Sequence, residues 1–277
     1  MLSTLRCLPP IGLALLALLF ACLARAENLV IPGSGNPEHV LGQLAKAFNE
    51  RQSQHRVIVP PSTGTAGAVR DVGEGISSLG RVGRSLKDDE ARQGFVHVPL
   101  GRDPVVIVGG AQVGVGKLTS AQLLDIYGGK IRNWSELGGR PAPIRVLGRE
   151  NSDASRQALG RSIKPFKDLV FDPVVKVVHL DPQLIELLDR YPTSLGFLNR
   201  SALGAAQSKL VHLALDGVDP TPENVEQGRY PAWVELGLIH KPNGLTPAGR
   251  AFLDFVRSPD GLGLLRRHGI LPASGAR

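Results

Sequence analysis

Apolar runs and helical patterns alternate along this chain, with short turns of small polar residues between them. Residues 29–31, 57–59 and 105–108 form short apolar runs of the kind that fill buried strands. Between the first two runs, apolar residues recur at helical spacing from Val40 to Phe48. Strand, turn and helix repeated in this order predict α/β layers with parallel strands.

The second half of the chain continues this alternation. Further strands are predicted at 144–147, 174–178 and 194–198, and helices at 120–127, 183–189, 247–256 and 262–265. Pro259 separates the last two helices, because proline cannot continue a helix. The acidic run Asp88-Asp89-Glu90 is interpreted as the solvated start of a short helix. The chain is therefore expected to be globular from Glu27 to about Ala273.

The first 26 residues are predicted to be a secretory signal peptide rather than part of the fold. Arg6 precedes an apolar run from Ile11 to Leu23, and Ala24-Arg25-Ala26 is a small-x-small cleavage pattern. The sequence Leu19-Phe20-Ala21-Cys22 is loosely similar to a lipobox, in which Cys22 would carry a lipid anchor. Simple cleavage before Glu27 is favoured, because phenylalanine fits that pattern poorly. The mature protein is expected in the periplasm or outside the cell.

Composition and charge argue against several classes of function. The chain has 32 Lys and Arg against 25 Asp and Glu, spread along the sequence, and only 5% aromatic residues, whereas nucleic-acid binding favours clustered basic residues with interleaved aromatics. The seven histidines lack metal-ligand spacing, and both cysteines lie in the predicted signal peptide. No nucleophile elbow of a serine hydrolase occurs. We therefore expect a binding protein, not an enzyme, without cofactor, metal or nucleic acid.

Three turns of small polar residues each lead from an apolar run into a predicted helix. They are Gly33–Asn36, Ser62–Gly67 and Asn151–Ser155. Turns of this kind leave backbone N–H groups unpaired at a helix start, where the helix dipole adds partial positive charge. Together they predict a site for one small anion. Each turn alone is weaker evidence, because Ser, Thr and Gly are also ordinary helix caps and turn residues.

Longer segments carry a resemblance to a known family. In chain order they are RVGRSLK at 81–87, IYGGKIRNW at 126–134, Tyr230-Pro231 and FLDFVRSPDG at 252–261. With these segments the chain resembles the periplasmic phosphate-binding proteins of ABC-type importers over nearly its whole mature length.

The resemblance implies a two-lobed α/β fold of the type II periplasmic binding protein class, with a mixed sheet flanked by helices in each lobe. One lobe would comprise 27–103 and 198–277, and the other 104–197. The ligand would be held in the cleft at the hinge. The implied protein is monomeric, captures phosphate or a related small oxyanion, and delivers it to an ABC-type membrane permease.

The resemblance also implies which residues bind the anion. The matching positions are Ser34, Gly35 and Asn36 in the first turn, Thr65 in the second, and Arg149, Ala154 and Ser155 at the third. A guanidinium such as that of Arg149 suits the paired oxygens of an oxyanion.

Two positions depart from the family pattern. Arg84 stands where phosphate binders usually carry an acceptor aspartate, and Asp153 stands where they carry a serine of the third turn. A carboxylate about 4 Å from a bound anion costs about 4 kcal/mol at an effective dielectric constant of 20. Asp153 could pair with Arg84 or Arg149, accept the proton of a protonated oxyanion, or cap its own helix. The cap or ion pair is favoured.

The departures also motivate an alternative function. An ion pair between Arg84 and Asp153 would fill the cleft. The chain would then be a binding-protein-fold module without a transport role, acting in cell-surface adhesion, matrix assembly or signalling.

Overall fold

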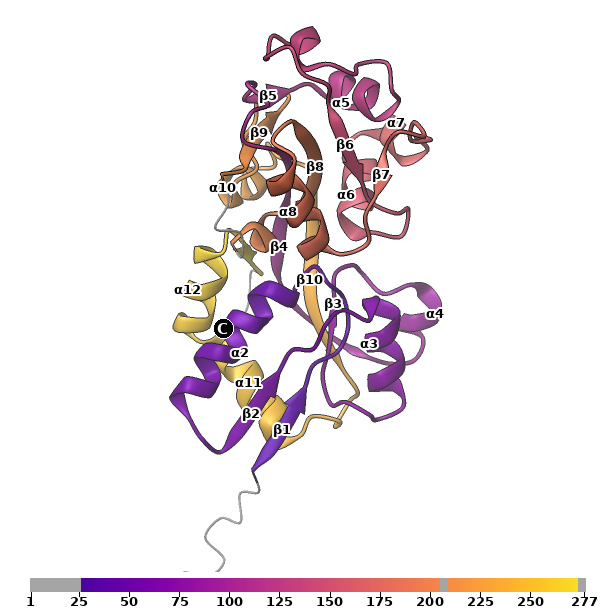
Figure 1. The fold of residues 1–277 in the computed structure, drawn as a ribbon. Coiled ribbons are helices and arrows are strands. Elements are labelled where there is room, and N and C mark those ends of the chain that lie inside the picture. The colour runs from indigo at the N-terminus through magenta and orange to yellow at the C-terminus, as the bar shows by residue number, and fades with distance from the viewer. Residues whose placement is uncertain (1–25, 205–208, 274–277) are drawn as a thin grey trace, which may run out of the picture.

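A computed structural model describes residues 26–204 and 209–273 of the chain. It has two lobes, one above the other in Figure 1. The predicted signal peptide before Ala26 and the candidate lipid anchor at Cys22 lie outside the described residues. Within the part of the chain that is described, no helix has the length and apolar character needed to cross a membrane.

The lower lobe contains the first third of the chain and the last helices. Its elements are β1 (Glu27–Val30), α2 (Glu38–Arg51), β2 (His55–Ile58), α3 (Gly64–Gly73), β3 (Gly80–Val82), α4 (Asp88–Ala91), α11 (Pro247–Arg257) and α12 (Pro259–Arg267). β1 and β2 pair in parallel, as the strand-turn-helix pattern predicts. α2 buries the predicted apolar stripe from Val40 to Phe48, where Phe48 packs edge-on against Phe252 of α11.

The upper lobe contains the middle of the chain. Its elements are β5 (Lys117–Leu118), α5 (Ser120–Tyr127), the 3₁₀ turn Trp134–Leu137, β6 (Arg145–Gly148), α6 (Ala154–Ser162), α7 (Lys164–Lys167), β7 (Lys176–Val177), α8 (Asp181–Arg190), β8 (Ser194–Asn199), α9 (Arg200–Leu203), β9 (Val211–Leu215) and α10 (Pro222–Glu226). Tyr127, Phe166 and Phe197 form an aromatic cluster at its centre. The strands predicted at 144–147 and 194–198 are β6 and β8, which pair in parallel.

Two long strands join the lobes. β4 (Val96–Gly109) pairs with β10 (Trp233–His240) along residues 96–104, and then with β8 and β9 along residues 105–109. The short strand β11 (Leu271–Pro272) adds to the β4 edge. These pairings are antiparallel, so the prediction of parallel strands is wrong for the strands that link the lobes. β4 leads from the lower lobe into the upper lobe and β10 returns beside it, so the two strands run in opposite directions. The result is one mixed sheet in the order β3-β10-β4-β8-β6-β7.

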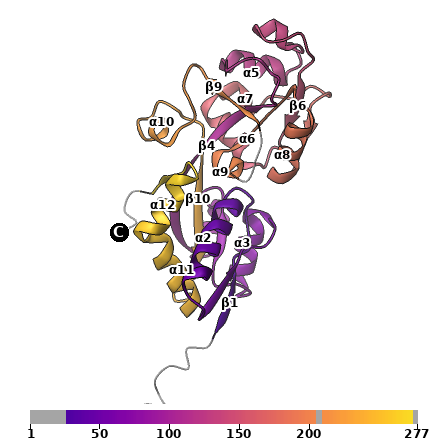
Figure 2. The same cartoon turned by 60° about the vertical axis from the view of Figure 1, so that its left-hand side comes forward.

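The turned view in Figure 2 shows the last two helices of the chain against the lower lobe. α11 and α12 pack beside α2 of the lower lobe, as the predicted C-terminal return requires. β9 instead pairs with β4 and β5 of the upper lobe. The lobe boundaries stay a prediction, but this pairing favours a return to the lower lobe after α10 rather than at residue 198.

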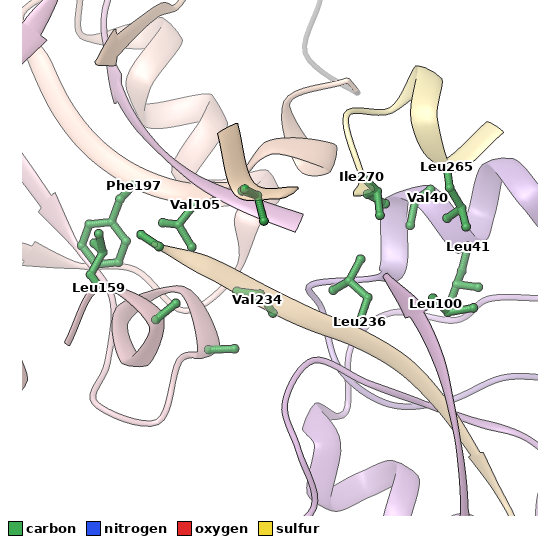
Figure 3. Packing of buried hydrophobic residues seen from close by; sticks show 14 of the residues in the cluster. Val40, Leu41, Leu100, Val105, Leu159, Phe197, Val234, Leu236, Leu265 and Ile270 are labelled. Carbon is green, nitrogen blue, oxygen red and sulfur yellow. The ribbon is translucent and has the colours of Figure 1, made fainter. Parts of the chain in front are cut away.

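One apolar core continues through both lobes along β10. In Figure 3, Val105, Leu159 and Phe197 pack at the upper-lobe end of this strand, and Leu100 and Leu41 at the lower-lobe end. Val234 and Leu236 of β10 lie between the two groups. Burying such side chains stabilises the fold by about 25 cal/mol per Å² of apolar surface, so this shared core helps to hold the lobes together.

Candidate functional site

The first turn follows β1 and is shaped by its contact with β3. The Ser34 amide donates to the Arg81 carbonyl oxygen at 2.9 Å. Gly33 has φ 134°, a left-handed conformation that favours glycine, and a Cβ there would collide with the same carbonyl. The Ser34 amide is therefore used inside the lobe. The Ser34 hydroxyl donates to Asn36 Oδ1 at 3.4 Å, a long hydrogen bond that it can exchange for one to a ligand.

Arg81 holds this turn from beneath. Its fully buried guanidinium donates to the carbonyl oxygens of Ser34 at 2.7 Å and Pro60 at 2.7 Å, to that of Ile31, and to Glu38 at 3.1 Å. Burial lowers the pKa of Arg81 and raises that of Glu38, and the ion pair between them opposes both shifts. Arg81 thus ties the first turn to the approach of the second.

The second turn brings Thr65 to the same place. Thr65 lies in the first turn of α3, and its hydroxyl oxygen accepts from the Gly83 amide at 3.4 Å. A Cβ on Gly83 would lie 2.5 Å from Ser34 Oγ and 2.9 Å from Asn36 Oδ1. Ser34, Asn36 and Thr65 therefore gather around a glycine backbone that comes too close for any side chain.

The third turn places Arg149 and Asp153 together. Asp153 is the N-cap of α6: its carboxylate accepts from the Arg156 amide at 3.0 Å and lies 2.8 Å from the Arg149 guanidinium. Arg149 also pairs with Asp181 and donates to the His179 carbonyl at 3.1 Å. Two carboxylates therefore share one buried guanidinium, and this trio carries a net negative charge when both are ionised.

The electrostatics of the trio reflect its burial. Burial raises the pKa of Asp153 and Asp181 raises it further, while the Arg149 charge and the amides of Arg156 and Ser155 lower it; the net direction is upward. Burial alone would lower the pKa of Arg149, but the two aspartates raise it above its usual value. Arg149 Nε is buried and has no hydrogen-bond partner among the described residues. An orphan buried donor is uncommon and costly, so it marks a place for an acceptor.

The two lobes meet where the first and third turns face each other. Asn36 Nδ2 lies 3.4 Å from Ser155 Oγ, a hydrogen bond between residues 119 positions apart. Ser34 Oγ in turn donates to Asn36 Oδ1 at 3.4 Å. Ser34, Asn36, Thr65, Arg149 and Ser155 are all buried. The structure therefore brings the predicted turns from both lobes to one site and closes it against solvent.

Arg84 has a different partner from the one that the alternative function requires. Its guanidinium makes a bidentate pair with Glu90 at 2.7 and 2.8 Å, and this hydrogen bonding lowers the pKa of Glu90. Glu90 is buried, so the interpretation of this acidic run as wholly solvated is wrong. The hypothetical Arg84–Asp153 ion pair is also wrong, because each side chain pairs within its own lobe. The favoured prediction, that Asp153 caps its helix and pairs with an arginine, is confirmed.

Four further residues build the site and were not predicted. Arg81 lies in the RVGRSLK segment, whose sequence signal is the family resemblance, and no sequence motif marks Asp181, Asn199 or Asp103. Asp181 reaches Arg149 from 32 positions away, and Asn199 reaches Asn36 from 163 positions away. The one local signal is the acidic start of α8 at Asp181, which is also what an ordinary helix N-terminus shows.

Comparisons with known proteins agree with this architecture. The family model of the PBP superfamily domain matches residues 23–260, so the chain belongs to the PBP superfamily, the class of two-lobed binding proteins that the fold and cleft indicate. This confirms the family resemblance and the two-lobed fold class inferred from the sequence.

Particular relatives are more specific. The chain is 28% identical over 244 residues to the phosphate-binding protein PstS of Bacillus subtilis, which covers 84% of this chain and 76% of the relative. It is 27% identical, with a TM-score of 0.79, to a Clostridium perfringens protein solved with bound phosphate and described as a candidate substrate-binding protein of a phosphate ABC transporter; the match covers 89% of this chain and all of the other. An ABC-type phosphate transport receptor from Vibrio cholerae, 23% identical with a TM-score of 0.65, shares the fold over 89% of this chain and all of its own.

Proposed function

We propose that this protein captures phosphate between its lobes outside the cytoplasm and delivers it to an ABC-type permease. The observation that carries the proposal is the meeting of buried donors from both lobes, with Asn36 and Ser155 in contact across the cleft. It acts by binding and release, without catalysis. The names of the Bacillus subtilis and Clostridium perfringens proteins support phosphate as the ligand and the permease as the partner.

The donors of this site suit a tetrahedral oxyanion. Thr65 and Ser155 offer hydroxyl hydrogens, and Ser34 offers its own in exchange for the long bond to Asn36 Oδ1. Arg149 offers its Nε–H, which meets no protein acceptor in the described part of the chain. Hydrogen bonds from a charged donor to an anion are about twice as strong as neutral ones. We assign these four residues, with the turns at Gly35 and Ala154, to the anion site. Arg84 is left out of the set, because its fork is fully engaged by Glu90.

Asp153 is an internal competitor for the ligand. Its carboxylate already occupies the donors at the start of α6 and part of the Arg149 fork. Phosphate that approaches the same donors must displace this carboxylate or meet it in its protonated form, since two ionised groups there repel by about 4 kcal/mol. The upward shift of the Asp153 pKa favours the protonated form near a bound anion. Asp153 thus weakens binding compared with the serine that the family usually carries.

The alternative function, a module without a transport role, loses its structural motive. It required Arg84 and Asp153 to fill the cleft together, and these residues pair with Glu90 and Arg149 instead.

Calorimetric titration of ligand-stripped protein with phosphate, arsenate and sulfate tests the proposal. We expect heat with phosphate for the natural protein, and binding about 10-fold tighter for Asp153→Ser, a gain of about 1.4 kcal/mol as one repulsive group is removed. Asp260→Ser is the matched control, because Asp260 is an exposed aspartate that pairs with Arg51 at 2.6 Å, and it should bind like the natural protein.

Absence of binding in both the natural protein and Asp153→Ser would contradict phosphate capture. Binding that is lost in Asp153→Ser would instead make Asp153 a ligand rather than a competitor.

A further inference from the structure

A chain of buried polar side chains connects the hinge to the anion site. It begins at Asp103 in β4, which pairs with Val234 of β10 just before β4 passes into the upper lobe. It continues through Asn199 at the end of β8 and Asn36 of the first turn, and ends at Ser155. Asp103 and Asn199 are both fully buried, so water does not compete for their hydrogen bonds.

The hydrogen bonds of Asp103 are those of an acceptor. Asp103 Oδ2 accepts from Asn199 Nδ2 at 2.7 Å, and Asp103 Oδ1 accepts from the Ser201 amide at 3.1 Å. The same Asn199 NH₂ group lies 3.0 Å from the Asn36 carbonyl oxygen. Because an ionised carboxylate has no proton to give, it admits only one orientation of the Asn199 amide, with the NH₂ group toward Asp103.

That orientation passes along the chain. The Oδ1 atom of Asn199, on the other side of its amide, accepts from Asn36 Nδ2 at 3.1 Å. The Asn36 amide is therefore fixed as well: its NH₂ group also faces Ser155 Oγ at 3.4 Å, and its oxygen accepts from the Ser34 hydroxyl. Since the Ser155 oxygen accepts from Asn36, the Ser155 hydroxyl hydrogen stays available to point elsewhere.

We propose that Asp103 is a positioning residue for the anion site, which acts through Asn199 and Asn36 to leave the Ser155 hydroxyl as a donor to the bound anion. The role rests on the proposed function, but the orientation of the amides does not. Loss of the ionised acceptor at Asp103 removes the shortest of the contacts that hold the Asn199 NH₂ group, at 2.7 Å, and leaves those to the Asn36 carbonyl oxygen and Ser201 Oγ, each at 3.0 Å. The orientation of the Asn199 amide is then held less strongly. When this amide turns around, the Asn36 amide turns with it, and Ser155 donates to Asn36 instead of to the ligand.

Protonation of Asp103 is the natural way to loosen this relay. Burial raises the pKa of Asp103 to about 7, and the negative charge of Asp181 adds to the rise, while the hydrogen bonds from Ser201 and Asn199 oppose it. The strands and helices around Asp103 bring neutral partners from β10, β8 and α9, namely Val234, Asn199 and Ser201. The titratable groups on neighbouring helices are Asp181 of α8 and, on α2, Glu38, which pairs with Arg81, and His39, which packs on His268. The relay is thus set at alkaline pH and loosened as the pH falls below about 7.

Asp103→Asn separates this role from a purely structural one. We expect phosphate affinity at pH 8 to fall about 10-fold, the cost of a misdirected hydrogen bond to a charged group. The melting temperature of Asp103→Asn at pH 8, by contrast, should rise. A folded-state pKa raised above the usual aspartate value of 3.8 means that the natural protein loses stability as the pH rises toward 7, and the neutral amide avoids this loss.

The variant should therefore melt at a higher temperature than the natural protein at pH 8, with a smaller advantage at pH 5. Asp172→Asn, which removes a carboxylate paired with Arg132 elsewhere in the upper lobe, is the control and should leave affinity unchanged. The proposal would be overturned if Asp103→Asn bound phosphate as tightly as the natural protein. It would also be overturned if the variant lost affinity and melted at a lower temperature at pH 8.

A reciprocal exchange tests the direction of the relay. In the double variant Asp103→Asn with Asn199→Asp, the new carboxylate accepts from Asn36 as the Asn199 oxygen does now, and the new amide donates to it. The new carboxylate also meets the Asn36 carbonyl oxygen, but this repulsion is the same in Asn199→Asp alone and cancels in the comparison. We expect this double variant to bind phosphate at least 3-fold more tightly than Asn199→Asp alone, which places two carboxylates side by side. A double variant no better than either single one would contradict the relay.

The relay has a readout that needs no ligand. In ¹⁵N-labelled natural protein, the side-chain NH₂ signals of Asn36 should shift with a midpoint near pH 7, and this shift should be absent in Asp103→Asn. If the natural protein binds none of the tested oxyanions, the proposed function fails while this measurement still decides the relay. Asn36 signals that ignore pH from 5 to 9 would overturn it.

Discussion

Arg81 and Arg149 are both buried arginines beside a turn of the anion site, yet they are used differently. Arg81 donates to three carbonyl oxygens and one carboxylate, all in its own lobe. Arg149 is shared by Asp153 and Asp181 and keeps one buried donor, Nε, without a partner among the described residues. A saturated guanidinium can only hold structure, whereas an unsaturated one among exchangeable anions can bind a further anion.

The two lobes also differ in the charge of the groups that they bring to the site. In the lower lobe, neutral hydroxyl and amide groups of Ser34, Asn36 and Thr65 surround the Gly83 backbone, over the buried charge of Arg81. In the upper lobe, charged groups face the cleft directly, and Asp153 occupies the anion donors of its own helix. Affinity is therefore expected to depend mostly on the upper lobe, and the shape of the cleft on the lower one.

The largest effect is expected from Arg81→Met. It removes a buried cation and leaves Glu38 and three carbonyl oxygens without their donor, so the free energy of unfolding should fall by about 3 to 5 kcal/mol. Urea denaturation followed by circular dichroism measures this. Arg51→Met removes an exposed arginine paired with Asp260 and should cost less than about 1 kcal/mol. Equal losses in the two variants would contradict a scaffolding role for Arg81.

Arg149→Lys should separate binding from folding. Lysine keeps a positive charge between Asp153 and Asp181 but has no Nε donor and no planar fork. Phosphate affinity should fall about 100-fold, equivalent to about 2.8 kcal/mol, while the free energy of unfolding changes by about 1 kcal/mol. Calorimetry and urea denaturation provide the two values, with Arg132→Lys on the surface as the matched variant. Unchanged affinity would show that Arg149 serves structure alone, as Arg81 does.

The smallest effect is expected from Arg84→Gln. The change breaks the pair with Glu90 but removes no donor from the proposed anion site, so phosphate affinity should change less than about 3-fold. The pair lowers the pKa of Glu90, so its stabilising effect exists above the usual carboxyl range and is lost as the pH falls through the lowered pKa. Melting temperatures of the two proteins should therefore converge at acid pH. A 10-fold loss of affinity would return Arg84 to the set of ligands.

Much of the fold could be predicted, because the relevant signals are local. The apolar stripe of α2 and the runs that became β1, β2, β6 and β8 are set by side-chain period alone. The direction of β4 and β10 could not be predicted, since paired residues such as Pro104 and Trp233 lie 129 positions apart, with the whole upper lobe between them. No nearby residue specifies this pairing.

The site was predictable in the same uneven way. Helix-cap chemistry is local, so the role of Asp153 at the start of α6 followed from its residue type and place. The choice between Arg84 and Arg149 as its partner depended on which lobe each side chain belongs to. Glu90, the partner of Arg84, is buried, but its acidic neighbours Asp88 and Asp89 are typical of an exposed segment, so its burial could not be predicted.

The sequence by itself determined the class of the protein, the three turns and the anion chemistry they favour, because turns and caps are made by residues within a few positions of each other. Only the tertiary structure decided which charges meet. It placed Arg81 against the carbonyl oxygens of its own lobe and Arg149 between two aspartates. It also placed the hinge residue Asp103 beside Asn199, which in turn contacts Asn36. The physical reason is that electrostatic and hydrogen-bond partners are chosen by distance in space, and burial then multiplies the strength of whichever pairs the fold has made.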